Sequence, residues 1–174
     1  MSDLFEKVTD ARNGLEKLMA KIPGVGGYLD AQQRRATDKI VRETVAARYE
    51  AQVKRISDLQ VEMVSMGAYE VLDGVERAVT KLRVFIDGVK TAAYGYSGLF
   101  SAVKINNDTL ARIYEHDIAL MNSVEQLEQA VDNIEHSLDD SAALPAAVRN
   151  LTRVAQAAVD AFESRKEILK GISD

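Results

Sequence analysis

The chain has 174 residues, a net charge of -5, 47% hydrophobic residues, 28% charged residues and only two prolines. This composition is typical of a folded helical protein and excludes collagen-like and strongly disordered chains. The mild acidity argues against a dedicated nucleic-acid binder, which needs a basic face for phosphates. The absence of cysteine excludes disulfides, thiolate metal sites and a cysteine nucleophile. We expect one domain over residues 1–174.

The first predicted helix covers about residues 3–22. Charged residues are scattered along it, so it offers neither a signal-peptide core nor a membrane span, and we expect a cytoplasmic protein. The following segment IPGVGGYLD ends the helix, because proline and glycine continue a helix poorly. Its glycines lack the Lys-Ser/Thr pair and the preceding strand of a phosphate loop. The helix is amphipathic, with one apolar stripe formed by Leu4, Val8, Ala11, Leu15, Leu18 and Ile22.

Four further helices are predicted over about residues 31–66, 68–96, 108–139 and 145–171. Apolar residues recur at alternating steps of three and four in each, which is the pattern of packed helices. The stripe of the second of the five helices contains Ala36, Ile40, Val45, Tyr49, Val53, Ile56, Leu59, Met63 and Met66. The most regular stripe is that of the third, with Leu72, Val75, Val79, Leu82, Ile86, Val89, Ala93 and Tyr96.

Two residues mark the boundaries of these helices. Gly67 offers a turn after the second helix, and Pro145 suits the first turn of the last one. We therefore predict an all-α fold, a four- to five-helix up-and-down bundle with long antiparallel helices. The alternative is an elongated coiled-coil hairpin that oligomerisation completes.

The segment YGYSGLF, residues 94–100, interrupts the helical pattern with aromatic residues and glycines. Glycine costs a helix roughly 1 kcal/mol relative to alanine, and these glycines fall where the third helix must stop. We interpret the aromatic residues Tyr94, Tyr96 and Phe100 as a cover over one end of the bundle. The alternative is a small aromatic pocket in which the glycines let a ligand approach the backbone.

Asp117 occupies an apolar position of the fourth stripe. A buried carboxylate must be paired, hydrogen-bonded or protonated, so we expect an ion pair with a cation of residues 34–55 that fixes helix register. Two alternatives are a stripe that rotates Asp117 to the helix edge and a functional acid. In a ligand-binding bundle Asp117 would be the polar anchor of a pocket lined by Tyr49, Tyr94, Tyr96, Phe100, Tyr114 and Met121.

Charge is distributed unevenly along the chain. Residues 34–55 carry seven basic and three acidic side chains, whereas residues 101–150 carry three basic and nine acidic ones. The two segments can face each other within the bundle or across a dimer. Alternatively, the amphipathic first helix and a basic patch dock on an anionic membrane surface. This patch consists of Arg34, Arg35, Lys39 and Arg42.

The pattern of histidines and carboxylates gives no recognisable catalytic or metal constellation. His116 and His136 both follow a glutamate directly, whereas di-iron bundles need Glu-x-x-His on one inward face. Asp132, His136 and Asp140 share a helix face, which is more typical of a solvated acidic surface than of a metal site. The sequence also lacks a Gly-x-Ser-x-Gly elbow. We expect no enzyme activity, no metal and no cofactor.

Three segments together resemble a group of small all-helical bacterial proteins with no assigned activity: IPGVGGYLDAQQRRATDKIVRE, AAYGYSGLFSAVKI and LARIYEHDIAL. That group has an Ile-Pro-Gly…Gly-Tyr turn, an Arg-Arg-x-x-Asp-Lys-x-x-Arg helix and a Tyr-Gly-Tyr-x-Gly-Phe joint. In this chain Leu99 intervenes before Phe100. The resemblance covers residues 1–125, implies a bacterial source and a helical fold, and transfers no catalytic residue. It also raises a paired role for Arg34, Arg35, Asp38 and Arg42.

These observations lead to an expectation about function. We expect a non-catalytic helical interaction or scaffold module that binds a protein partner or another copy of itself. One alternative is a bundle that binds a small ligand between its helices, and another is docking on a membrane surface. We expect no binding of nucleic acid.

Overall fold

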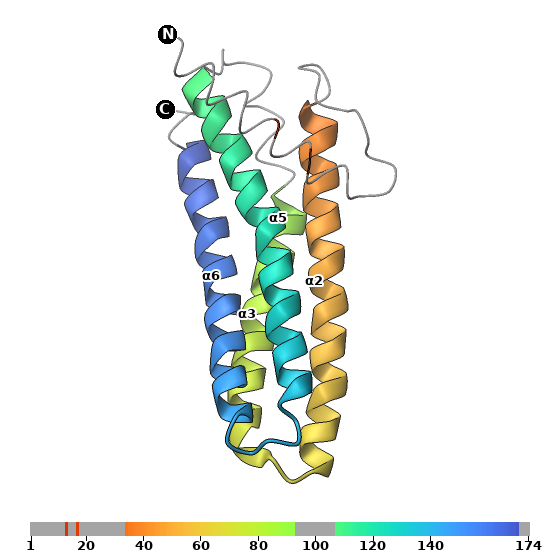
Figure 1. Cartoon of the computed structure of the whole chain (residues 1–174). Coiled ribbons are helices and arrows are strands. Elements are labelled where there is room, and N and C mark those ends of the chain that lie inside the picture. Colours follow the sequence, from red (N-terminus) through yellow and green to blue (C-terminus); the bar gives the residue numbers. More distant parts are fainter. Residues whose placement is uncertain (1–12, 14–16, 18–33, 93–106, 171–174) are drawn as a thin grey trace.

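The computed structural model describes residues 13, 17, 34–92 and 107–170, with side chains over 40–92 and 115–164. The described elements are α2 (Arg34–Ser65), the 3-10 helix η1 (Tyr69–Val71), α3 (Leu72–Thr91), α5 (Asn107–His136) and α6 (Leu144–Lys170). No strand occurs within these ranges. The prediction of an all-α helical bundle is confirmed (Figure 1).

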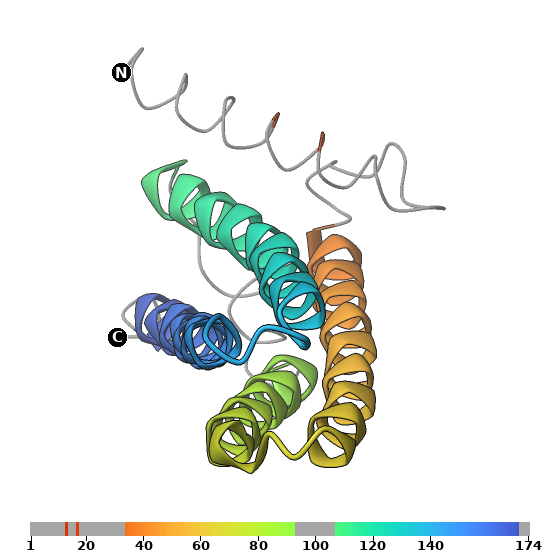
Figure 2. The same cartoon turned by 60° about the horizontal axis from the view of Figure 1, so that its bottom comes forward.

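The helices alternate in direction along the chain, but two of the adjacent pairs are parallel. Around the bundle the order is α2, α3, α6, α5, so that each helix contacts two neighbours (Figure 2). Hydrogen-bonded side chains of α2 and α5 are 74 to 80 residues apart in sequence along their whole contact, as expected for parallel helices. The α3–α6 pair is also parallel, whereas α2–α3 and α5–α6 are antiparallel. Chain neighbours α3 and α5 are therefore diagonal to each other.

The core follows the predicted stripes closely. All five α3 stripe residues from Val75 to Val89 are buried. Most stripe residues of the other helices whose side chains are described are buried as well, and Phe85 adds a large buried ring that the α3 stripe did not include. The most deeply buried large side chains are Tyr49, Phe85, Ile56, Met63, Leu82, Leu127, Ile134, Leu144 and Leu151. The described helices thus enclose a core within a single chain.

Two glycines allow α3 and α6 to approach each other closely. A Cβ atom on Gly88 would lie 2.6 Å from Cε1 of Phe162, and one on Gly74 would lie 2.7 Å from Cγ1 of Val148. Real Cβ contacts are longer, so a side chain at either position would displace its neighbour. Thr152 Oγ1 also donates a 3.2 Å hydrogen bond to the Gly74 carbonyl. This contact between α3 and α6 is therefore tight and specific.

The predicted turn at Gly67 is confirmed, but one core residue beside it was wrongly predicted. Gly67 has φ 78°, and the hydrogen bonds Gly67 N to Val64 O (3.1 Å) and Ala68 N to Met63 O (2.9 Å) form a Schellman cap. Met66, expected in the core, is 49% exposed, because α2 ends at Ser65 and the chain turns away from the bundle.

The junction between α5 and α6 also agrees with the sequence. Pro145 lies in the first turn of α6, as predicted. Before it, Asp140 Oδ1 accepts hydrogen bonds from Ala142 N (2.9 Å) and Ala143 N (3.0 Å). This carboxylate satisfies backbone donors where the chain reverses.

The helix predicted over 3–22 lies almost wholly outside the described residues. Asn13 and Lys17 are helical and exposed. The predicted end of the third helix at residue 96 also falls outside the described part, in which α3 ends at Thr91.

Candidate functional site

Asp117 is buried, with 4% of its surface exposed. This overturns the alternative in which the stripe turns Asp117 to the helix edge. Because partners on the parallel helices α2 and α5 are 74 to 80 residues apart, Asp117 lies level with residues 37–43 of α2. Arg42 belongs to that level and is itself only 5% exposed. The core therefore contains a polar layer near the start of α2, with a carboxylate on one helix and a guanidinium on the next.

Arg42 also joins this layer to α3. Its Nη1 donates a 3.2 Å hydrogen bond to the carbonyl oxygen of Val89, in the last turn of α3. A helix C-terminus carries a partial negative charge from its orphan carbonyls, which favours a cation at this point. This hydrogen bond joins α2 to the end of α3. The structural role expected for Asp117 stays a prediction.

Tyr49 lies further along α2 and belongs to the core. Its hydroxyl donates a 2.8 Å hydrogen bond to Ser123 Oγ, and its ring lies 4.3 Å from the ring of Phe85, centroid to centroid. Burial raises the pKa of Tyr49 to about 12, against a smaller lowering by the Ser123 hydrogen bond. Tyr49 and Met121, expected to line a ligand pocket, are both buried in the core. A ligand pocket between the helices, which these residues would line, stays a prediction.

The remaining residues of the expected sites lie outside the described side chains. Tyr94, Tyr96 and Phe100 fall in residues 93–106. Tyr114 lies in α5, and Arg34, Arg35 and Lys39 lie at the start of α2. The side chains of these four residues are outside the described part of the structure.

Ion pairs connect α2 with α5 along the middle of the bundle. Arg48 makes a two-pronged contact with Glu128, with Nη2 2.8 Å from Oε1 and 2.9 Å from Oε2. Arg55 Nη2 lies 2.9 Å from Asp132 Oδ1 and 2.7 Å from Glu135 Oε2. The hydrogen bond to Asp132 raises the pKa of Arg55 above its ordinary value, and the smaller effect of burial lowers it. The complementary charges predicted from the sequence thus meet within one chain.

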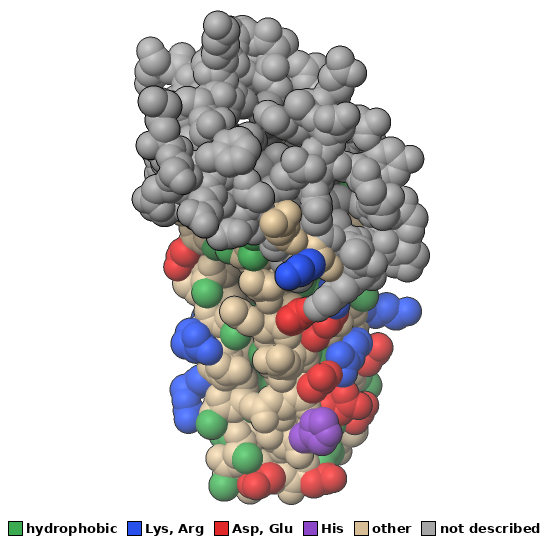
Figure 3. Space-filling view, turned by 45° about the horizontal axis from the view of Figure 1, so that its top comes forward, with side chains coloured by type: hydrophobic (Ala, Val, Ile, Leu, Met, Phe, Trp, Pro, Cys, Tyr) green, Lys and Arg blue, Asp and Glu red, His purple; other side chains and the backbone are tan. Residues whose placement is uncertain are grey.

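Lys90 of α3 adds a further link to α2. Its Nζ lies 2.5 Å from Glu50 Oε1. In Figure 3, basic and acidic side chains lie next to one another along the middle of the face in view. Two cations of segment 34–55, Arg48 and Arg55, are therefore engaged by carboxylates of the same chain.

Residues 132–140 contain the three side chains that share a face around His136, but each has another contact. His136 Nδ1 donates to the Asp132 carbonyl at 2.7 Å, the Asp132 carboxylate pairs with Arg55, and Asp140 caps the turn. Among the described residues, no group of three or more histidines, aspartates and glutamates is placed to hold a metal ion. Within the same ranges, no helix combines the length and apolarity needed to cross a bilayer.

A groove of about 440 Å³ lies on the surface of α3. Its lining is polar and comes from a single helix, so side chains do not converge on it from several elements. Lys81 at its edge is hydrogen-bonded to Gln156 of α6. The groove has no arrangement of acid, base and nucleophile, and it carries no chemical proposal. The lining residues are Asp73, Glu76, Arg77, Thr80 and Lys81.

The end of the bundle where α2 meets η1 and α5 meets α6 has a different surface. We call residues 61–76 and 132–148 the turn end; it lies at the bottom in Figure 1 and comes forward in Figure 2. Of the five large hydrophobic side chains that are exposed in the described part of the chain, four belong to it. Val61 is 70% exposed and Tyr69 is 65% exposed, and the other two are Val64 and Met66.

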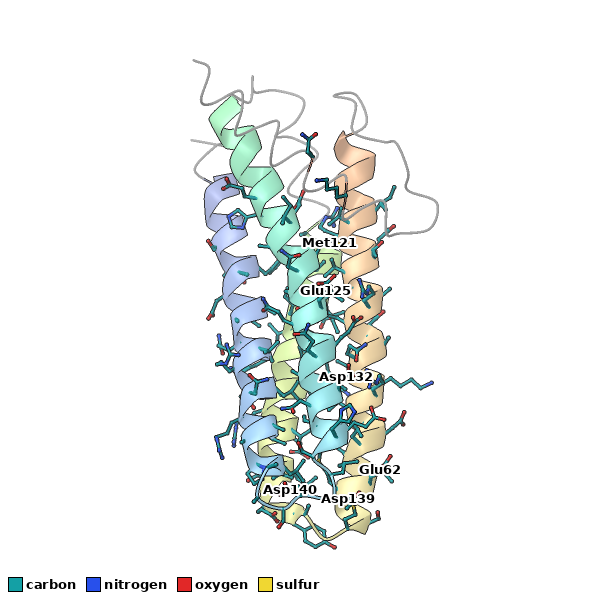
Figure 4. All side chains as sticks on the ribbon, viewed as in Figure 1. Glu62, Met121, Glu125, Asp132, Asp139 and Asp140 are labelled. Carbon is teal, nitrogen blue, oxygen red and sulfur yellow. The ribbon has the colours of Figure 1, made fainter. Side chains whose placement is uncertain are left out.

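The turn end is also acidic, without any lysine or arginine. Its eight carboxylate residues are all exposed, and Glu62, Asp139 and Asp140 lie near the tip (Figure 4). At the lower end of the face shown in Figure 3, acidic and hydrophobic side chains occur without basic ones. The eight residues are Glu62, Glu70, Asp73, Glu76, Asp132, Glu135, Asp139 and Asp140.

The turn end was not predicted from the sequence, although the sequence contains a signal for an acidic surface. No lysine or arginine occurs in residues 56–76 or 113–148, two stretches far apart in the chain that the fold brings together. The exposed apolar residues lie in the sequence VEMVSM just before Gly67, and Tyr69 follows it. Periodicity places Val61 opposite the α2 stripe, where an apolar residue has no role in the core.

Comparison of the chain with protein-family models, with curated proteins and with solved structures finds no match.

Proposed function

We propose that this protein is a non-catalytic interaction module that binds a protein partner through its turn end. The observation that carries the proposal is the clustering of four exposed large hydrophobic residues within positions 61–69. Single exposed apolar residues are ordinary, but a contiguous group on a small domain is typical of a binding surface. The group contains Tyr69 and Met66, two residue types that are enriched in interfaces.

The rest of the described molecule supports this assignment. The core is enclosed by four helices of one chain, so the apolar residues of the turn end are not needed to complete it. The cations Arg48 and Arg55 have intramolecular partners between α2 and α5. What remains without an internal structural role is the apolar surface of the turn end.

Two other functions are less well supported. A ligand pocket in the bundle would lose Tyr49 and Met121, which are packed in the core. Docking on an anionic membrane through helix 3–22 and the basic start of α2 would have to do without Arg42, which is only 5% exposed.

Affinity capture from cells that express the chain naturally tests the proposal, with quantitative comparison of three baits. The double variant Val61→Ser, Tyr69→Ser removes two exposed apolar side chains of the turn end. Val84→Ser is the matched control, because Val84 is an exposed valine (57%) on the outer face of α3. We expect one defined set of proteins with the wild type and Val84→Ser that is lost with the double variant. Equal recovery by all three baits would contradict the proposal.

A further inference from the structure

We infer that the partner segment recognised by the turn end is a cationic amphipathic helix, with apolar residues on one face and lysine or arginine beside them. This inference rests on the proposed function and adds the chemistry of the partner. The turn end carries acidic residues as well as the apolar group formed by Val61, Val64, Met66 and Tyr69, and a partner helix must match both.

The charge of the turn end is unbalanced. The turn end carries eight exposed carboxylate residues, and its two residue ranges contain no lysine or arginine, although Arg77 follows directly and lines a groove with Asp73 and Glu76. Arg55, from outside the turn end, engages Asp132 and Glu135. Of the remaining six, Asp73 and Glu76 share the groove on α3 with Arg77 and Lys81. Glu62, Glu70, Asp139 and Asp140 are thus left without a described lysine or arginine beside them. Such a surface attracts a positively charged partner over a distance of about a Debye length, roughly 8 to 10 Å.

The apolar group follows the end of α2 and the turn after it. Val61 and Val64 are three residues apart, so they lie on one side of the last turns of α2. Met66 and Tyr69 follow on either side of the Gly67 turn, and Tyr69 lies so close that a Cβ on Gly67 would be 4.0 Å from its ring. The four exposed side chains are thus spread as a strip along the last turns of α2 and the turn at Gly67. A partner helix would fit such a strip with apolar residues at i, i+3, i+4 and i+7.

Two other occupants fit the same surface less well. In a two-fold symmetric dimer through the turn ends, the same patch of each copy would meet itself. The carboxylates of one copy that have no cation beside them would then meet the same carboxylates of the other, and like charges in a contact cost several kcal/mol. An anionic membrane would be repelled for the same reason. A head-to-tail contact with the basic start of α2 of a second copy remains an outcome that the experiment separates.

The experiment is a titration of the isotopically labelled full chain with designed helical peptides, followed by backbone amide NMR. The first peptide has leucine at i, i+3, i+4 and i+7 with lysine on both flanks. The second has glutamate in place of each lysine, and the third has serine in place of each leucine. We expect the first peptide to shift amide signals of residues 61–76 and 132–148. We expect binding at least tenfold weaker for each of the other two.

Variants of the protein make the same test from the other side. Val61→Ser with Tyr69→Ser should weaken binding of the lysine peptide at least tenfold, since the loss of even one buried valine or tyrosine costs about that factor. Val84→Ser should bind as the wild type does. Glu62→Gln with Asp139→Asn should weaken binding and reduce its dependence on salt.

The outcomes separate this inference from the proposed function. Equal binding of the lysine and glutamate peptides would overturn the inference about charge. Shifts confined to other surfaces, or no binding, would also overturn it. The proposed function would stand in either case if the double variant Val61→Ser, Tyr69→Ser fails to capture the proteins that the wild type captures. Amide shifts at the turn end that appear without peptide as the protein concentration rises would assign the surface to a second copy and overturn the inference.

Discussion

Carboxylates are used differently in two regions of this molecule. Between α2 and α5, Glu128 is met by Arg48, and the buried Asp117 lies level with Arg42. Asp132 and Glu135, at the border with the turn end, are met by Arg55. At the turn end, Glu62 and Asp139 lie in a surface without lysine or arginine and beside exposed apolar side chains. The difference indicates that charge in the first region stabilises the fold, whereas charge in the second is available to a partner.

The largest effect is expected at the buried polar layer. Asp117→Leu should lower the free energy of unfolding by about 3 kcal/mol, because it removes a negative charge from the level of the core at which the Arg42 guanidinium is buried. The measurement is urea unfolding combined with native mass. Adding Arg42→Met should restore part of the loss, with a coupling energy above about 1 kcal/mol. Unchanged or raised stability of the single variant, with an unchanged mass, would remove the role of Asp117 in fixing register.

Tyr49 makes the same region sensitive to alkaline pH. Its folded-state pKa of about 12 lies above the ordinary value of 10.0, so the folded chain keeps the phenol proton longer than the unfolded chain does. The stabilisation is present below pH 10 and is lost between pH 10 and 12, at up to about 1.4 kcal/mol per pH unit.

Tyr49→Phe supplies the control for this pH dependence. The stability difference between the wild type and Tyr49→Phe, measured by urea unfolding at several pH values, should fall over that range. A constant difference from pH 9 to 12 would show that Tyr49 titrates in the same way in both states.

A smaller effect is expected for the ion pair on the surface of the α2–α5 contact. Glu128→Gln removes the two-pronged acceptor of Arg48, whose side chain is 40% exposed, so we expect a loss below about 1 kcal/mol. Added salt should reduce the difference between variant and wild type. A loss that is independent of salt would indicate that packing, not charge, is responsible.

Neutralising carboxylates of the turn end should not lower the stability of the protein. Glu62→Gln with Asp139→Asn removes carboxylates that have acidic neighbours, so stability should stay the same or rise by up to about 0.5 kcal/mol. Thermal unfolding at low salt measures this directly. A loss comparable with that of Glu128→Gln would show that these carboxylates are paired within the fold and would erase the contrast between the two regions.

The helices and most of the core could be predicted from the sequence, because the stripe from Val75 to Val89 has an unbroken period. The ring order could not, since short turns favour adjacency of chain neighbours, whereas α3 and α5 are diagonal. Met66 was misplaced because periodicity continues past the point where the Gly67 turn ends α2.

The candidate site was predictable only in part. Asp117 was recognised because a carboxylate in an apolar stripe breaks a local pattern. The turn end was missed because its residues come from two distant segments, neither of which is unusual by itself. Its charge and its exposed apolar side chains become one surface only when the fold brings the two turns together.

The central claim, that the turn end is a docking surface, is tested most directly by cross-linking in living cells from a photoreactive residue. One chain carries it at position 69 in place of Tyr69, and a matched chain carries it at position 84 in place of Val84. We predict a discrete adduct of higher mass from position 69 and none from position 84. Equal adducts from both positions, or none from position 69, would contradict the claim.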